Sequence, residues 1–350
     1  MSVKRVALKD LTVGSILADS IVSVTGKILL GKDSVLTTRH ISLLDTWDVK
    51  SVLISIDVEE KVEADISLQE KAQAIHSAEY IQFVQEYDSI VANTVLSFDI
   101  IQRQKKIPVS HFKDAAGSIY SSITRNNVRV MNYLLISDHN LADVITRHSV
   151  RVAYFAGIIA RQMKWSQNDI AGVAFASLLH DVGNLVNGKN QDPCVQVNIA
   201  DSGRLLKETQ GLSNEVILGI MQHRERIDCS GIPNGTQGNR IHPYAKIIAV
   251  ADHFHNLAHG DECVNPLRIL DILTREMYGA FDPDICQSLI CRVRDSLLFN
   301  KIILSSGQEA EIIFFNSNNY CLPVVKTVDN QIIDLSQRRD LTISRISIPA

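Results

Sequence analysis

The residues best suited to chemistry lie near the middle of the chain. His180 and Asp181 stand side by side directly after an apolar run, residues 171–179. Burying a carboxylate beside an imidazole is costly unless the charge is paired or bound to a metal ion. Taken alone, the pair is more typical of a core histidine with its hydrogen bonds satisfied than of a metal site.

Three further residues make a metal site the better interpretation. His148 precedes the pair, and His223 and Asp252 follow it. Each lies in a segment whose apolar residues recur with helical spacing, so a helical bundle could bring them together. Imidazole and carboxylate ligands suit Mn, Fe or Zn better than Ca or Mg. The order His, His-Asp, His, Asp therefore predicts a divalent transition-metal centre.

The composition narrows the class of protein. The chain has 350 residues, 45% of them apolar, which is enough for two or three domains with sizeable cores. A net charge of -4 with scattered basic residues argues against nucleic-acid binding. No apolar run approaches the ~20 residues of a membrane-spanning helix. The N-terminus lacks a signal-peptide core, and the six cysteines form no Cys-x-x-Cys pair, so we expect a cytoplasmic protein with reduced thiols.

The apolar patterns predict a mainly α protein, in which a helical bundle has small β-rich modules at both termini. We expect a small α/β module over 1–60, a helical connector over 61–135, a helical domain with the candidate ligands over 136–297, and a β-rich domain over 298–350. Pro108 should divide the connector into two helices. Its apolar face could support a homodimer, although packing on the next domain explains it equally well.

Short β-prone runs separated by turn residues mark both ends of the chain. At the N-terminus we predict strands at 27–32 and 52–56, and a short helix at 38–44. At the C-terminus five runs predict a small sheet or barrel: 302–304, 311–315, 322–326, 331–335 and 341–344.

Four spaced motifs resemble those of the HD-GYP family, a branch of the HD metal-dependent phosphohydrolases. They occur in the family's order at residues 148–152, 179–183, 225–233 and 245–252. The resemblance implies a helical domain with a centre of two or three metals that hydrolyses cyclic di-GMP. In such a centre the metals lower the pKa of a bound water and neutralise the phosphate.

The resemblance also implies roles for individual residues. The ligand set of one metal is matched by four residues: His148, His180, Asp181 and Asp252. Asp181 matches the carboxylate that bridges to a second metal, and His223 is a partial ligand for that second site. We expect Asp181 and Arg224 to be catalytic. Four residues are expected to bind substrate: Arg224, Asn184, Gly231 and Pro233.

The chain departs from the family at several of these positions. Asn184 stands in place of a phosphate-binding Lys, and Ile232 replaces the Tyr of the Gly-Tyr-Pro signature. Arg224 replaces the second histidine of a His-His pair. Arginine has no lone pair for a metal, but its planar fork suits phosphate. The histidines that follow Asp252 are either replacement ligands or surrounding residues: His253, His255 and His259.

Two functions follow from this pattern. The first is a cyclic di-GMP signalling protein that acts as a metal-dependent phosphodiesterase, with a reduced site of one Mn or Fe per chain and weakened activity. The alternative is a catalytically inactive module of the same fold that binds a ligand or a protein partner. A one-metal hydrolase of other phosphoesters remains a third hypothesis. None of these functions requires nucleic acid or a membrane segment.

Overall fold

The structure is a computed structural model of the chain. It describes the following residues: 3–12, 15–22, 28–30, 32, 36, 40–41, 44, 49–55, 78–125, 127–135, 144–186, 199–259, 265–316, 321–338 and 340–346. They divide into two compact units. One consists of Met1–Ile75 with Asp138–Val144, and the other of His76–Ser137 with Ile145–Ala350.

The first unit is a small β-rich module. Strand β1 (Val3–Ala7) pairs antiparallel with β4 (Ser51–Ser55), and β2 (Ile21–Val22) pairs antiparallel with β3 (Ile28–Leu30). A short 3-10 helix, η1 (Leu8–Asp10), follows β1. Five buried residues form the core: Leu17, Leu30, Leu36, Leu44 and Val52. The strands predicted near residues 28 and 52 are present, whereas the helix predicted over 38–44 falls largely outside the described residues.

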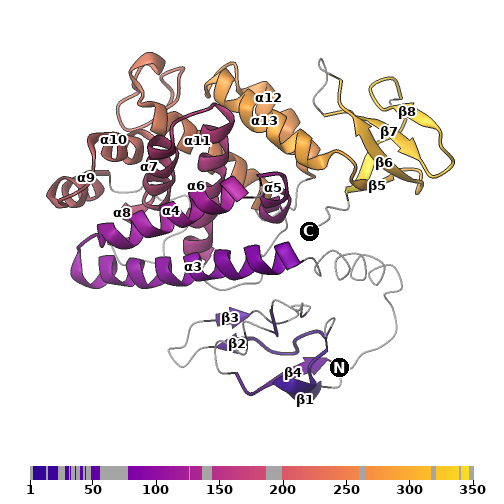
Figure 1. Ribbon diagram of the computed structural model, residues 1–350, viewed down its shortest axis with the longest axis horizontal. Helices are drawn as coiled ribbons and strands as arrows, with labels where there is room; N and C mark the ends of the chain where they lie inside the picture. The colour runs from indigo at the N-terminus through magenta and orange to yellow at the C-terminus, as the bar shows by residue number, and fades with distance from the viewer. Residues whose placement is uncertain are drawn as a thin grey trace. The chain divides into compact units, whose positions relative to one another are not determined.

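The second unit begins with two long helices that lie side by side, α3 (Ala78–Gln104) and α4 (Val109–Arg125) (Figure 1). They are separated at Pro108, as predicted, because proline lacks the N–H that a continuing helix needs. Apolar residues three and four positions apart on α3 face inward, among them Tyr87, Val91 and Phe98. These two helices belong to the same hydrophobic core as the helices that follow them.

Within the described residues, the bundle continues with these helices: α5 (Asn127–Leu135), α6 (Val144–Gln162), α7 (Gln167–Leu178), α8 (Val182–Val186), α9 (Ile199–Glu208), α10 (Asn214–Gln222), α11 (Pro243–His259), α12 (Pro266–Glu276) and α13 (Pro283–Leu297). Helix α6 is buried on nearly every side, and α7 packs against α4, α10 and α11. Ser166 caps the N-terminus of α7 by accepting a hydrogen bond from the Asp169 N–H. The cap determines where α7 begins, and the length of α7 then determines where His180 lies.

The C-terminal part of this unit is a five-stranded antiparallel sheet in the order β8-β7-β6-β5-β9. The strands are β5 (Lys301–Leu304), β6 (Glu309–Phe314), β7 (Val324–Thr327), β8 (Ile332–Asp334) and β9 (Ile343–Ile346). Ile302, Ile312 and Val325 are buried in the same core as the helices. The predicted fold class, a helical bundle with small β-rich modules at both ends, is therefore confirmed.

Among the described residues, the structure contains no helix with the length and apolar character required to cross a membrane. Helix α13 ends at Leu297, immediately before the sheet. The domain boundaries drawn from the sequence stay predictions.

Candidate metal centre

His180 and Asp181 lie in the tight turn that joins α7 to α8. Ser177, on the last turn of α7, is fully buried, and its carbonyl oxygen lies 2.7 Å from Nδ1 of His180. A carbonyl can only accept, so Nδ1 donates and carries the proton of this imidazole. The other ring nitrogen of His180, Nε2, is left with a free lone pair.

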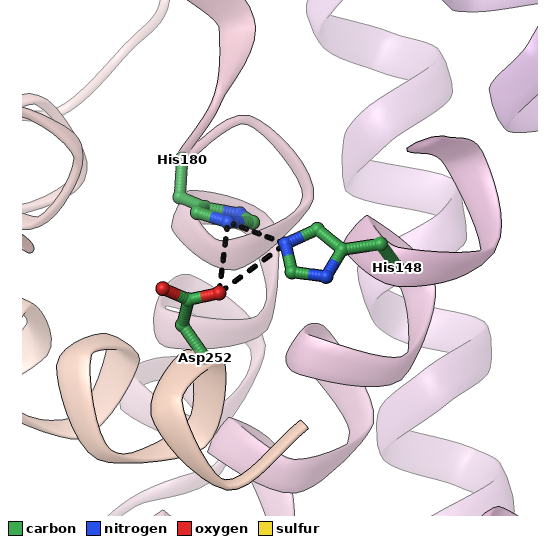
Figure 2. A group of neighbouring side chains, drawn as sticks. All are labelled: His148, His180 and Asp252. Atoms are coloured by element: carbon green, nitrogen blue, oxygen red, sulfur yellow. Dashed lines mark hydrogen bonds and ion pairs between the residues drawn. The ribbon is translucent and has the colours of Figure 1, made fainter. Parts of the chain in front are cut away.

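Two helices bring His148 and Asp252 to this lone pair. His148 lies on α6 and Asp252 on α11, and Figure 2 shows both side chains pointing toward His180. Nε2 of His148 lies 3.1 Å from Nε2 of His180 and 3.3 Å from Oδ1 of Asp252. Nε2 of His180 is 3.8 Å from the same Asp252 oxygen. Residues far apart in the sequence therefore present three ligand atoms to one point.

Asp181 offers its two oxygens to different neighbours. Oδ2 lies 3.5 Å from Nε2 of His180 and 3.9 Å from Nε2 of His148. Oδ1 lies 3.8 Å from Nε2 of His223 and 3.1 Å from Nη2 of Arg224. The carboxylate thus stands between the first group of ligands and a second group around His223.

His223 follows the last residue of α10 and is buried. Its Nδ1 donates to the Ile220 carbonyl at 2.7 Å, so its Nε2 also presents a lone pair. Arg224 occupies this side of the site, because its Nε donates to that Nε2 at 3.3 Å while its Nη2 donates to Asp181. The guanidinium is thus a cation held between Nε2 of His223 and Oδ1 of Asp181.

The donor set fits a bound cation. Two groups of described residues place ligand atoms within 4.8 Å of one another: His148, His180 and Asp252, and His180, Asp181 and His223. Imidazole lone pairs and carboxylate oxygens that converge without a proton between them repel each other, and a divalent ion removes this repulsion. Histidine with carboxylate is a ligand combination suited to transition metals.

The electrostatics of the cluster reflect this crowding. Burial alone would raise the pKa of Asp181 and Asp252, but the neighbouring histidines outweigh it and hold both pKa values below the usual range. Burial would lower the pKa of His148, but Asp252 and Asp181 raise it overall. Burial, followed by the charge of His180, lowers the pKa of His223 to about 4. The His223 imidazole is therefore neutral near pH 7.

The residues predicted to bind substrate lie around this cluster. Asn184 is exposed on α8, and its N–H donates to the Asp181 carbonyl. Gly231 and Pro233 lie in the loop over residues 228–236, which is tied to Arg224 by a hydrogen bond from the Ile232 N–H to the Arg224 carbonyl. The substrate roles of these three residues stay predictions.

Glu225 organises that loop. Its buried carboxylate accepts hydrogen bonds from the N–H groups of Asn234 and Thr236 and from the Thr236 hydroxyl, at 2.8–3.0 Å. This role of Glu225 was not predicted from the sequence. An acidic residue shortly before a turn-rich loop was the available signal for it.

The histidines after Asp252 lie outside the two groups of candidate ligands. Nε2 of His253 lies 2.5 Å from a carboxylate oxygen of Glu276, and Nε2 of His259 donates to the Leu134 carbonyl at 2.9 Å. His255 is buried, and its Nδ1 lies 3.0 Å from Nδ1 of His148, at the opposite edge of that ring from Asp252. None of the three belongs to the two groups of ligand atoms found among the described residues.

Comparison with known proteins agrees with this geometry. Residues 131–285 match the family described as HD domain. A cyclic di-GMP phosphodiesterase of Pseudomonas aeruginosa is 22% identical over 268 residues, which cover 70% of this chain and 64% of the relative. The solved structure of an HDG"Y"P protein from Bdellovibrio bacteriovorus has the same fold, with a TM-score of 0.53 at 17% identity over 82% of this chain and 98% of that one. Residues 131–285 therefore belong to the HD domain family.

Other relatives of this HD-domain protein carry related names. A 3'3'-cGAMP-specific phosphodiesterase of Vibrio cholerae is 31% identical over 158 residues, which cover 41% of this chain and 34% of the relative. The cyclic di-GMP phosphodiesterase PdeB of Borreliella burgdorferi is 19% identical over 86% of this chain and 82% of the relative. The chain spans less than two thirds of the length of the Pseudomonas and Vibrio relatives.

Proposed function

We propose that this HD-domain protein is a metal-dependent phosphodiesterase that opens a cyclic dinucleotide, with cyclic di-GMP as the favoured substrate. The observation that carries the proposal is the convergence of two imidazole nitrogens and two carboxylates, His148 and His180 with Asp181 and Asp252. Relatives named for cyclic di-GMP and 3'3'-cGAMP hydrolysis support a cyclic dinucleotide as the substrate class.

In this proposal these four residues hold one Mn or Fe ion per chain. A metal at such a site lowers the pKa of a bound water and neutralises phosphate charge. The protein contributes the arrangement of the ligands. The Ser177 and Ile220 carbonyls orient the imidazoles of His180 and His223, so that their Nε2 lone pairs face the cluster.

Arg224 takes the place of part of a second metal site. Its guanidinium already contacts Oδ1 of Asp181 and Nε2 of His223, and its positive charge opposes binding of another cation there. The side chain is 29% exposed, so substrate can reach it. A planar guanidinium binds phosphate oxygens in pairs. We infer that Arg224 holds the phosphate and that hydrolysis is weaker than with two metals.

The same contact also supports the second candidate, a ligand-binding or protein-interaction module without turnover. Because Arg224 pairs with Asp181, this carboxylate is less available to hold a metal ion that would activate water. In this case the protein would bind a cyclic dinucleotide, or a partner protein, and release it unchanged.

The test is a hydrolysis assay of purified protein with cyclic di-GMP and 3'3'-cGAMP, in the presence of Mn or Fe. Wild type and the exposed-site control Asp284→Asn should convert cyclic di-GMP to a linear product, and Asp181→Ala should not. Binding without conversion, at any metal concentration, would favour the non-catalytic module. Conversion of 3'3'-cGAMP in preference to cyclic di-GMP would correct the substrate.

A further inference from the structure

His148 differs from His180 and His223 in the hydrogen-bond partner of its Nδ1 atom. His180 and His223 each donate Nδ1–H to a backbone carbonyl of the preceding helical turn. Nδ1 of His148 instead lies 3.0 Å from Nδ1 of another imidazole, His255 on α11. Histidine ligands of metals almost always use their second nitrogen in this way, but the partner is normally a carboxylate, a backbone carbonyl or water.

The chemistry of the pair determines the direction of the hydrogen bond. His148 can use its Nε2 lone pair for a metal only if its proton resides on Nδ1. His148 is then the donor, and Nδ1 of His255 must be the acceptor. His255 therefore carries its proton on Nε2, which is buried without a hydrogen-bond partner in the described part of the chain.

The ring of His255 is packed among other imidazole and guanidinium groups. The ring is buried, and its centroid lies 4.8 Å from that of His259. Nη1 of Arg151 lies 3.1 Å from Nδ1 of His259, which places a fixed positive charge nearby. Nδ1 of His255 thus meets the imidazole of His148 within a buried cluster of side chains.

From this geometry we propose that His255 is a positioning residue, which accepts the Nδ1 proton of His148 and thereby holds that imidazole in its metal-binding tautomer and orientation. The inference rests on the metal centre of the proposed function. It adds that the strength of metal binding depends on a residue that does not touch the metal.

The test compares variants that differ in their ability to accept at this position. His255→Phe keeps a planar ring but has no acceptor, whereas His255→Asn places an amide oxygen close to where Nδ1 lies. We expect His255→Phe to bind Mn or Zn at least tenfold more weakly than wild type. His255→Asn should bind within about threefold of wild type, and the exposed-site control His111→Asn should be unchanged. Affinity is measured by competition with a chelating dye, without reference to activity.

A second measurement does not depend on the folding of any variant. In zinc-loaded wild type, nitrogen-15 NMR of the imidazoles should show the proton of this pair on Nδ1 of His148, with Nδ1 of His255 bare. A proton on Nδ1 of His255 would overturn the inference. Equal metal affinity of wild type and a folded His255→Phe would do the same and leave the proposed function intact. Failure of wild type itself to bind metal would overturn the proposed function.

Discussion

Nη2 of Arg224 lies 3.1 Å from Oδ1 of Asp181, while the other oxygen of that carboxylate, Oδ2, faces His180 at 3.5 Å. One carboxylate thus links the group of candidate metal ligands to a fixed organic cation. The guanidinium neutralises the charge on Oδ1 of Asp181 but, unlike a metal ion, it does not activate a water molecule. We therefore expect the number of metals that this protein holds to depend on residue 224.

Replacing Arg224 by histidine should raise the metal content. The substitution removes a positive charge and adds a lone pair beside His223 and Asp181, which completes a second set of ligands. We expect elemental analysis of protein reconstituted with Mn to change from about one to about two ions per chain. The control is Arg275→His, because Arg275 is an exposed arginine of α12. An unchanged content of one ion would show that Arg224 is not what excludes the second.

Removal of the metal should destabilise the protein. An ion that binds the folded state alone stabilises it by about 2.7 kcal/mol when its concentration is 100 times Kd. Thermal unfolding of wild type should therefore shift upward when Mn is added and return when chelator is added. Asp252→Ala should show neither shift, because it removes the carboxylate nearest to His148. The same metal-dependent shift in Asp252→Ala would argue against this ligand set.

Glu225→Gln should loosen the loop over residues 228–236. Glutamine retains one acceptor oxygen and turns an NH2 group toward a backbone N–H that now donates to the carboxylate. Each hydrogen bond to a charged group contributes about 1.5–3 kcal/mol. We expect amide hydrogen exchange at Asn234 and Thr236 to become faster. Glu208→Gln, at an exposed position on α9, should leave those amides unaffected, and protection retained in Glu225→Gln would contradict the role of the carboxylate.

Gly231→Ala should destabilise the protein, whereas Gly117→Ala should not. A Cβ at Gly231 would lie 2.3–2.5 Å from backbone atoms of Glu225 and Arg226, so the loop would have to move. A Cβ at Gly117, within α4, meets nothing within 4 Å. Gly117→Ala should therefore raise the stability by about 0.5–1 kcal/mol, since alanine favours helix. Thermal unfolding of both variants checks the opposite signs, and nucleotide affinity checks that only Gly231→Ala affects binding.

Much of the architecture follows from local sequence. The helix break at Pro108 and the five C-terminal strands could be predicted because proline, turn residues and apolar spacing act over a few neighbouring residues. His148, His180, Asp181, His223 and Asp252 could be chosen as candidates from their order and residue types, and Arg224 from its departure from the family. Their metal and substrate roles stay proposals.

Only the tertiary structure decided which atoms face one another. Packing of α6 against α11 brings Nδ1 of His148 to His255, 107 positions further along the chain, and no periodicity encodes that distance. The two separate directions of the Asp181 oxygens, and the placement of Arg224 against one of them, likewise depend on how three segments pack. The sequence determines the type of each side chain. The hydrogen bonds that orient these side chains form between segments that meet only when the core packs.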